Sequence, residues 1–445
     1  MTAPDAAITE LDRLPRTLAT FRVATVAALI LLIPWRIYLE VIFHTHSPHL
    51  AGSGVQSTAL GPQDVLLVLL IIASIPLIFN RSRKMRMPIG QLGAALFALV
   101  VAVWLIMFPT IEGAMMLVRV AGVPAVILAI RAMSQSDLMV GVVWPLSIGA
   151  STQALLALFQ TLFFDTGLVV PATTLAVGRG WTAGLGAFSG PYALAAYLML
   201  AMAVALSVGI SKRPMNRYFN AVELSDRLRK MLWTTVILTS AAMATTFGRA
   251  ALLSIGLVGG VYLLGWLIHR QKIFLISALA ALGPLIATGI VLRSGWLVRA
   301  SQSADLDFTT RDDLAARALE MIRSSPLIGV GPVQYGPHLT RMDLAVLDVH
   351  IVHNIPLLVA AEFGIIIGVA FTAWLIALGI RSFRLSVYVG ALFVSILPLM
   401  LFDNLHYVYG NGIAMFAVWI AMLDYHRDIA FEPPFEHEPA DGSAS

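Results

Sequence analysis

The 445-residue sequence contains no cysteine, only four lysines and few charged residues of any kind. Without cysteine the chain can form no disulfide and has no thiolate to act as a nucleophile or metal ligand. Charged residues make up 12% of the chain, hydrophobic residues make up 58%, and the mean hydropathy is +0.84. A soluble domain of this length needs far more charge to cover its surface. The composition therefore excludes an ordinary soluble protein.

Long apolar runs recur between Val23 and Met422, and many reach the roughly 20 residues that cross about 30 Å of hydrocarbon. A backbone in lipid must satisfy its own hydrogen bonds, and the alternating pattern of a membrane barrel is absent. We therefore predict an all-α integral membrane fold with about twelve transmembrane helices. The predicted spans are 23–43, 62–79, 88–108, 112–130, 138–163, 187–210, 231–248, 250–268, 273–292, 353–380, 386–403 and 408–424.

Basic residues divide the predicted loops into two sets. One set holds 19 of the 29 basic residues, including every lysine, and the positive-inside rule makes these loops cytoplasmic. An even number of spans then places both termini in the cytoplasm. The predicted organisation is a cytoplasmic tail (1–22), nine spans (23–293), a periplasmic loop (294–352), three spans (353–424) and a second cytoplasmic tail (425–445).

The other ten basic residues are all arginines, and all but Arg119 lie in or near the predicted external segments. A planar guanidinium can bind two phosphate oxygens at once, which a lysine ammonium cannot do. These arginines are candidates for binding a phosphate-bearing substrate, or they contact lipid headgroups and acidic neighbours. Arg119 lies within a predicted span, where a charge is costly, and Gln153 and Gln160 are its expected partners. Its role, structural or substrate-lining, stays open.

The longest predicted external segment contains a helix. Thr310 is typical of an N-cap with acidic residues in the next turn, and Ser325-Pro326 is expected to end the helix. Arg311 lies on the apolar stripe of this helix, and Arg317 lies on another face. An amphipathic helix on the membrane surface explains such a stripe but not the arginine within it. The stripe consists of Leu314, Ala315, Ala318 and Ile322.

Three motifs follow this helix: Pro326-Leu-Ile-Gly329-Val-Gly331-Pro332-Val-Gln-Tyr335, His353-Asn354 and Glu362-Phe-Gly364-Ile-Ile-Ile-Gly368. Preceded by Arg311, they resemble in their order the O-antigen ligase and polymerase superfamily of membrane glycosyltransferases. A looser similarity extends to Thr246-Phe-Gly-Arg249-Ala-Ala and to the segment from Phe188 to Tyr197. Gly248 stands where relatives commonly carry serine, and the second segment lacks the family's two asparagines. These departures bear on the sugar contacts more than on the reaction class.

The resemblance implies a type C glycosyltransferase-like membrane fold. It further implies transfer of a glycan from undecaprenyl diphosphate to an acceptor hydroxyl at the periplasmic face of the bacterial inner membrane. Inversion at the anomeric carbon, without a metal or other cofactor, is the implied chemistry. The acceptor is lipid A core for a ligase, which the motif order slightly favours, or another lipid-linked glycan for a polymerase. Membrane lipids are further expected partners, and no nucleic acid is expected.

The chemistry of this reaction suggests roles for particular residues. A departing diphosphate needs its developing charge neutralised, and Arg249, Arg311 and Arg317 are the predicted ligands. The acceptor hydroxyl needs a base, and an imidazole titrates near neutral pH. We predict that His353 is this base and that His350, one helical turn earlier, orients the acceptor or shares the proton.

Other polar residues are predicted to line the acceptor site or to support it. These are Asn354, Tyr335, Arg179 and Asp403, with Asn404 and His406 beside the last of them. Glu362 lies nine residues beyond His353, on the opposite face of a continuous helix, and is predicted to be structural. Purely structural roles remain open for His353 and Arg249, because an interfacial histidine can cap a helix and Arg249 can anchor its turn.

Two other classes of function compete with a glycosyltransferase. A twelve-span transporter or lipid-linked glycan flippase would also carry intramembrane charge. Such a protein usually gathers its ionisable residues near the midplane, whereas here they gather at one external face, and the two halves of the sequence show no internal repeat. A non-catalytic assembly protein is the third reading.

Overall fold

The computed structural model describes residues 3–34, 61–79, 87–163, 187–188, 191–209, 226–341, 352–402 and 410–431. Within these ranges the chain forms helices and short connections, and they include no strand, which confirms the predicted all-α class. The N-terminal helices are α1 (Ala3–Leu32), α2 (Pro62–Phe79), α3 (Ile89–Met107), α4 (Ile111–Arg131), α5 (Gln135–Leu138), the π-helix η2 (Met139–Val143) and α6 (Trp144–Phe163).

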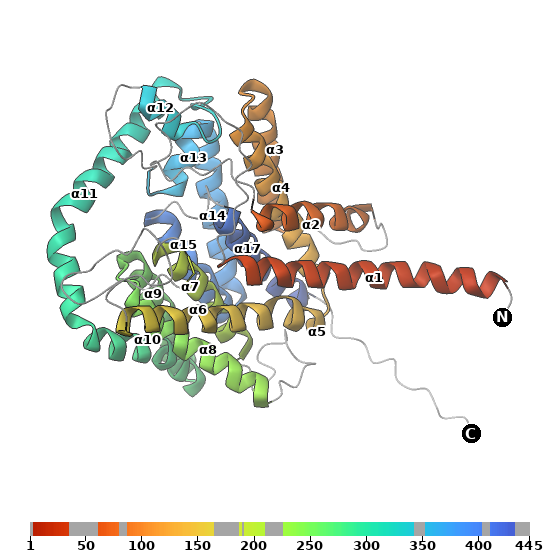
Figure 1. The fold of residues 1–445 in the computed structure, drawn as a ribbon, viewed down its shortest axis with the longest axis horizontal. Coiled ribbons are helices and arrows are strands. Elements are labelled where there is room, and N and C mark those ends of the chain that lie inside the picture. Colours follow the sequence, from red (N-terminus) through yellow and green to blue (C-terminus); the bar gives the residue numbers. More distant parts are fainter. Residues whose placement is uncertain are drawn as a thin grey trace.

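The remaining described helices fall into a middle group and a C-terminal group. The middle group is α7 (Pro191–Gly209), α8 (Asp226–Thr245), α9 (Arg249–His269), α10 (Lys272–Val291) and α11 (Arg293–Ser324). The C-terminal group is α12 (Tyr335–Arg341), α13 (Ile355–Phe363), α14 (Ile365–Leu385), α15 (Val387–Phe402) and α17 (Gly410–Phe431). In Figure 1, α11 forms a long arc on the left from α10 at the bottom to α12 at the top, and α1 extends to the right of the bundle.

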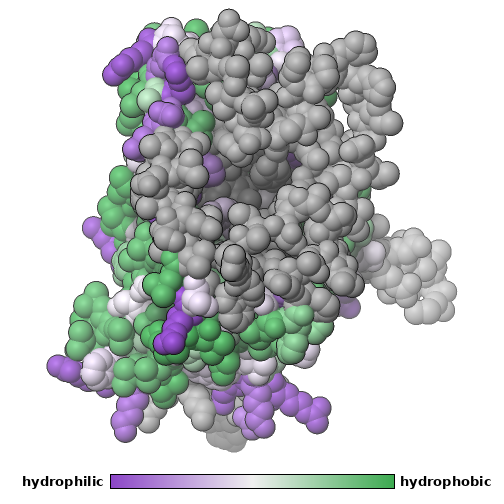
Figure 2. Space-filling model, turned by 60° about the vertical axis from the view of Figure 1, so that its left-hand side comes forward, coloured by the Kyte–Doolittle hydropathy of each residue, from purple (hydrophilic) through white to green (hydrophobic). Residues whose placement is uncertain are grey.

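Six helical segments among the described residues are long and apolar enough to cross a membrane. They are α3, α4, the continuous α5–η2–α6 segment, α9, α10 and α14. Apolar but shorter stretches lie in α2, α7, α15 and α17. Figure 2 shows hydrophobic residues along the left edge and lower part of the molecule, with hydrophilic residues mainly at the top left and along the bottom. The protein is therefore a multi-pass membrane protein, and the predicted number of twelve spans is not confirmed.

The core lies around α7, whose residues 193–208 are all buried. A helix that is apolar on every side must be enclosed by others, and α7 packs against α6, α8 and α15. α9 packs against α15 and runs antiparallel to it. Gly265 near the end of α9 faces Val387 at the start of α15, so Arg249 lies at the same end of the bundle as Phe402.

Residues 3–32 form one helix, α1, which includes Val23, the predicted start of the first span. Two other predicted helix limits were wrong. Thr310 is not an N-cap, because α11 begins at Arg293 and continues to Ser324, where the predicted stop at Ser325-Pro326 is confirmed. The predicted span 353–380 is interrupted at Gly364, which has φ +89° and separates α13 from α14. The break at Gly364 arises from nonlocal packing, because the backbone of residues 326–331 pairs with this junction.

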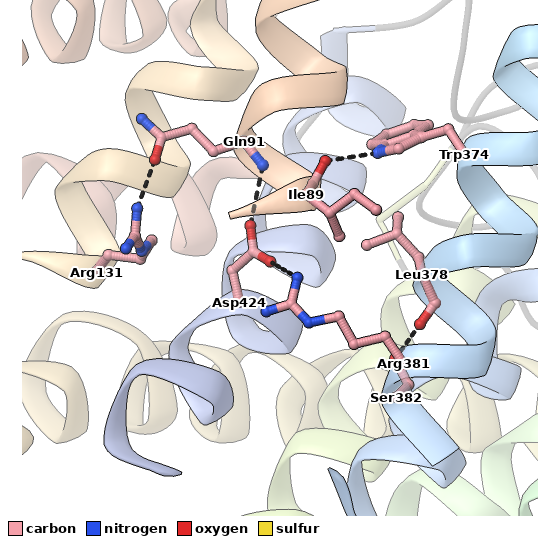
Figure 3. Close-up of polar contacts among 8 residues, drawn as sticks. All are labelled: Ile89, Gln91, Arg131, Trp374, Leu378, Arg381, Ser382 and Asp424. Carbon is pink, nitrogen blue, oxygen red and sulfur yellow. Dashed lines mark hydrogen bonds and ion pairs between the residues drawn. The ribbon is translucent and has the colours of Figure 1, made fainter. Parts of the chain in front are cut away.

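The end of the bundle farthest from His353 is held together by a polar network (Figure 3). Asp424 is 1% exposed, accepts a 3.0 Å hydrogen bond from the Gln91 backbone and lies 3.6 Å from Arg381. Arg131 donates to the Gln91 side chain, and Trp374 donates to the Ile89 carbonyl. No side chain of its own caps α3, so the carboxylate of α17 satisfies the first turn of that helix. We call this region the Asp424 end and the opposite region the His353 end. Along α14 the two are about 24 Å apart at 1.5 Å per residue.

Candidate functional site

The His353 end is built on a tight turn from Pro326 to Tyr335. Its backbone pairs with the junction of α13 and α14: Val330 and Gly331 donate to the carbonyls of Ala361 and Glu362, at 3.0 and 2.9 Å. A return bond of 2.8 Å runs from the Ile365 N–H to the Pro326 carbonyl. The turn and the junction therefore form one rigid unit, although roughly 30 residues separate them in the sequence.

Two glycines make this pairing close enough. A Cβ atom on Gly329 would lie 2.4 Å from the Glu362 carbonyl, and one on Gly364 would lie 2.3 Å from the Leu327 carbonyl. Both residues also have positive φ, at +74° and +89°, which glycine adopts without strain. Gly368 lies one turn farther along and packs directly on Ala360. The glycines of the third motif therefore serve close approach of backbone, as predicted for packing.

Glu362 binds the C-terminal end of the same turn. It is 2% exposed, and its Oε1 accepts a 3.3 Å hydrogen bond from the backbone N–H of Tyr335. The expectation that Glu362 is structural agrees with this contact. One partner of Glu362 is the turn, which the break at Gly364 brings close to it.

Tyr335 is fully buried and spans the gap from the turn to α11. Its hydroxyl donates a 2.7 Å hydrogen bond to the Leu314 carbonyl. Burial raises the pKa of Tyr335, the nearby Glu362 raises it further, and Arg317 lowers it. The net upward shift keeps the hydroxyl protonated, and the residue therefore acts as a donor.

Asn354 forms the N-cap of α13. Its Oδ1 accepts a 2.9 Å bond from the Leu357 N–H, and its Nδ2 donates a 3.2 Å bond to the Leu401 carbonyl of α15. Asn354 thus closes the start of one helix and the end of another. His353 immediately precedes this cap and is partly exposed, so its position is set by a residue held at both ends.

Arg311 reaches the same end of α15. Its Nη1 lies 3.5 Å from the Phe402 carbonyl, at the outer limit of a hydrogen bond. The predicted apolar stripe of α11 packs inward: Ala318 and Ile322 are buried, and Leu314 and Ala315 pack against the core. Arg311 and the His353-Asn354 pair, far apart in sequence, therefore converge on the last two carbonyls of α15.

Arg249 begins α9 after the short turn that the sequence predicts. Phe247 in this turn has φ +49°, and its ring packs on Trp296 of α11 at a centroid distance of 5.2 Å. Arg249 itself is exposed. Because α9 and α15 are antiparallel, its guanidinium lies at the His353 end. The structure thus places Arg249, Arg311 and His353 at one end of the bundle.

The remaining predicted residues have different outcomes. Arg317 is half exposed and makes a 2.9 Å ion pair with Glu320, one turn along α11. His350, Arg179, Asp403, Asn404 and His406 lie outside the described residues. Within the described ranges, no three metal-binding side chains of His, Asp or Glu gather at one point.

The sequence analysis missed the partner of Arg119. Its Nε and Nη2 donate to the two carboxylate oxygens of Asp64, at 2.8 and 3.0 Å, and both residues are buried. Asp64 also accepts a bond from the Gly61 N–H at the start of α2. An acidic residue in the first turn of an apolar span was the available signal. These contacts give Arg119 a structural role.

Comparison with known proteins shows that part of the sequence is similar to one family. The family model described as O-antigen ligase matches residues 234–372, from α8 to α14. The match includes the Arg249 turn, α11, the Pro326–Tyr335 turn and the His353-Asn354 pair. No curated protein is similar enough to the whole chain to count as a match. The family match supports the resemblance read from the motifs: residues 234–372 are similar to the O-antigen ligase family.

Proposed function

We propose that the protein is an O-antigen ligase-like glycosyltransferase. It would transfer a glycan from undecaprenyl diphosphate to a hydroxyl of lipid A core or another glycan at the periplasmic face of the inner membrane. The observation that carries this proposal is the convergence of Arg311 and His353-Asn354 on the end of α15, with Arg249 at the same end. A polysaccharide polymerase of the same superfamily differs from this proposal only in its acceptor.

The arginines act on the donor in this proposal. Arg311 and Arg249 bind the diphosphate, whose charge grows as its bond to the anomeric carbon breaks. Guanidinium groups held in a partly dehydrated site stabilise that charge more strongly than water does. The contact between Arg311 and the Phe402 carbonyl supports this role, because a neutral carbonyl orients a guanidinium without cancelling its charge.

His353 acts on the acceptor. The acceptor oxygen attacks the anomeric carbon from the face opposite the diphosphate, so the configuration inverts. The carbon–oxygen bond to the diphosphate breaks with its electron pair, and the acceptor proton passes to the imidazole. The proton later leaves to solvent. The cap formed by Asn354 supports this role because it holds His353 at the start of α13.

The test is glycan transfer by purified protein from a synthetic polyprenyl-diphosphate glycan, measured from about pH 5 to pH 9 with and without chelator. Loss of a general base typically lowers turnover by about 10²- to 10⁴-fold, so His353→Ala should show a loss in this range while still binding donor.

His269→Ala is the matched control, because His269 is an exposed histidine near the opposite end of α9. It should transfer at the unsubstituted rate. Full turnover by His353→Ala would remove the proposed base. Transport of donor without any transfer would favour a flippase, and loss of activity with chelator would replace the metal-free scheme.

A further inference from the structure

The short helix α13 connects two features of the His353 end. His353 and Asn354 stand at its start, and Glu362 stands near its end. Glu362 holds the backbone of Tyr335, and the Tyr335 hydroxyl in turn holds the Leu314 carbonyl of α11. Leu314 is three residues beyond Arg311 on the same helix. A continuous chain of contacts therefore runs from the helix of the histidine to the helix of the arginine.

We propose that Tyr335 is a positioning residue, which sets the place of Arg311 relative to His353 through its bond to Leu314. This inference rests on the proposed function, in which Arg311 binds the donor diphosphate. Tyr335 itself is fully buried and touches neither donor nor acceptor. Of its two predicted roles, contact with the acceptor or support of the site, the proposal takes the second.

The base of this chain cannot shift easily. Three backbone hydrogen bonds join the turn to the junction of α13 and α14, and the glycines at 329 and 364 leave no space between the two backbones. The ring of Tyr335 is thus fixed with respect to α13. Its hydroxyl is therefore a donor in a fixed position, and the Leu314 carbonyl of α11 must lie within hydrogen-bond distance of it.

Apolar packing alone does not fix the rotation of α11 about its axis. Ala318, Met321 and Ile322 are buried against the core, but apolar contact is non-directional. A hydrogen bond of 2.7 Å to one carbonyl is directional and selects one orientation of the helix. The contact of Arg311 with the Phe402 carbonyl is longer, at 3.5 Å, whereas the Tyr335 hydroxyl bonds this part of α11 at 2.7 Å.

The test is a double-mutant cycle on the dissociation constant for a synthetic polyprenyl-diphosphate glycan. Tyr335→Phe removes the hydroxyl and keeps the ring, and should weaken donor binding by about 3- to 10-fold, the usual effect of one such bond. In an Arg311→Ala background the same change should have no further effect, because the positioned group is gone. In an Arg249→Ala background the full factor should remain.

The outcomes separate this inference from the function on which it rests. If Arg311→Ala leaves donor binding unchanged, the proposed role of Arg311 is wrong, and the inference falls with it. If Arg311→Ala weakens donor binding but Tyr335→Phe has the same effect in the unsubstituted protein and in the Arg311→Ala variant, only the inference is overturned.

A second measurement does not depend on activity. Because the chain has no cysteine, spin labels can be placed at Asp312→Cys, beside Arg311, and at Ile365→Cys, at the start of α14. Both positions are exposed. Tyr335→Phe should shift or broaden the distribution of distances between the two labels, and an unchanged distribution would overturn the proposal. Glu362→Gln keeps an acceptor oxygen for the Tyr335 N–H and should leave the distribution as it is.

Discussion

Two arginines of this protein stand in opposite surroundings. Arg119 in α4 is 3% exposed, and Asp64 fills its guanidinium fork with two hydrogen bonds. Arg249 is exposed at the start of α9. It lies at the same end of the bundle as Arg311, which contacts the last carbonyl of α15. A buried carboxylate neutralises the first charge inside the protein, whereas the second is exposed at the end of the bundle where we propose that the donor binds. In an apolar protein, the burial of an arginine thus separates a structural role from a candidate role in binding.

The largest effect is expected at the buried pair. Asp64→Leu leaves the Arg119 charge buried without its carboxylate, which should lower the free energy of unfolding by about 3–5 kcal/mol. Thermal unfolding of the purified protein in detergent measures this loss. The double change Asp64→Leu with Arg119→Met removes both charges and should recover most of it. A stable Asp64→Leu protein would break the comparison, since Arg119 would then need no internal partner.

The next effect concerns the exposed arginines. Arg249→Lys and Arg311→Lys keep the charge but lose the planar fork, so each should reduce transfer about 30- to 1000-fold, equivalent to about 2–4 kcal/mol. Unfolding temperatures should stay close to that of the unsubstituted protein. Arg323→Lys, an exposed change in the last turn of α11, is the control and should transfer normally. Full activity in both lysine variants would argue against bidentate contact with the diphosphate.

The smallest effect is expected at Arg317. Its ion pair with Glu320 is half exposed, and such pairs contribute at most about 1 kcal/mol. Because Glu320 competes for the guanidinium, Arg317→Gln should reduce donor affinity by no more than about fivefold. Glu320→Gln removes the competitor, so donor affinity should rise slightly if Arg317 contacts the diphosphate. A loss as large as that of Arg311→Lys would place Arg317 among the principal ligands.

Local sequence patterns predicted much of the architecture. The apolar runs predicted a helical membrane protein, because a backbone in lipid must bond within itself. The interruption at Gly248-Arg249 predicted the turn between α8 and α9, and Ser325-Pro326 predicted the end of α11. The order of the motifs pointed to the superfamily that the match over residues 234–372 supports. These features depend on residues close together in the chain.

Contacts between distant residues decided the rest. The run from His353 through Gly368 is apolar enough for one helix, yet Gly364 breaks it because the backbone of the Pro326–Tyr335 turn pairs with the junction. No local pattern joins Asp64 to Arg119 or Tyr335 to Leu314, since each pair combines two helices whose relative position depends on the packing of the whole bundle. The sequence by itself determined which residues carry charge and that the chain is a bundle of apolar helices. Only the tertiary structure decided which charges are neutralised inside the bundle and which meet at the His353 end.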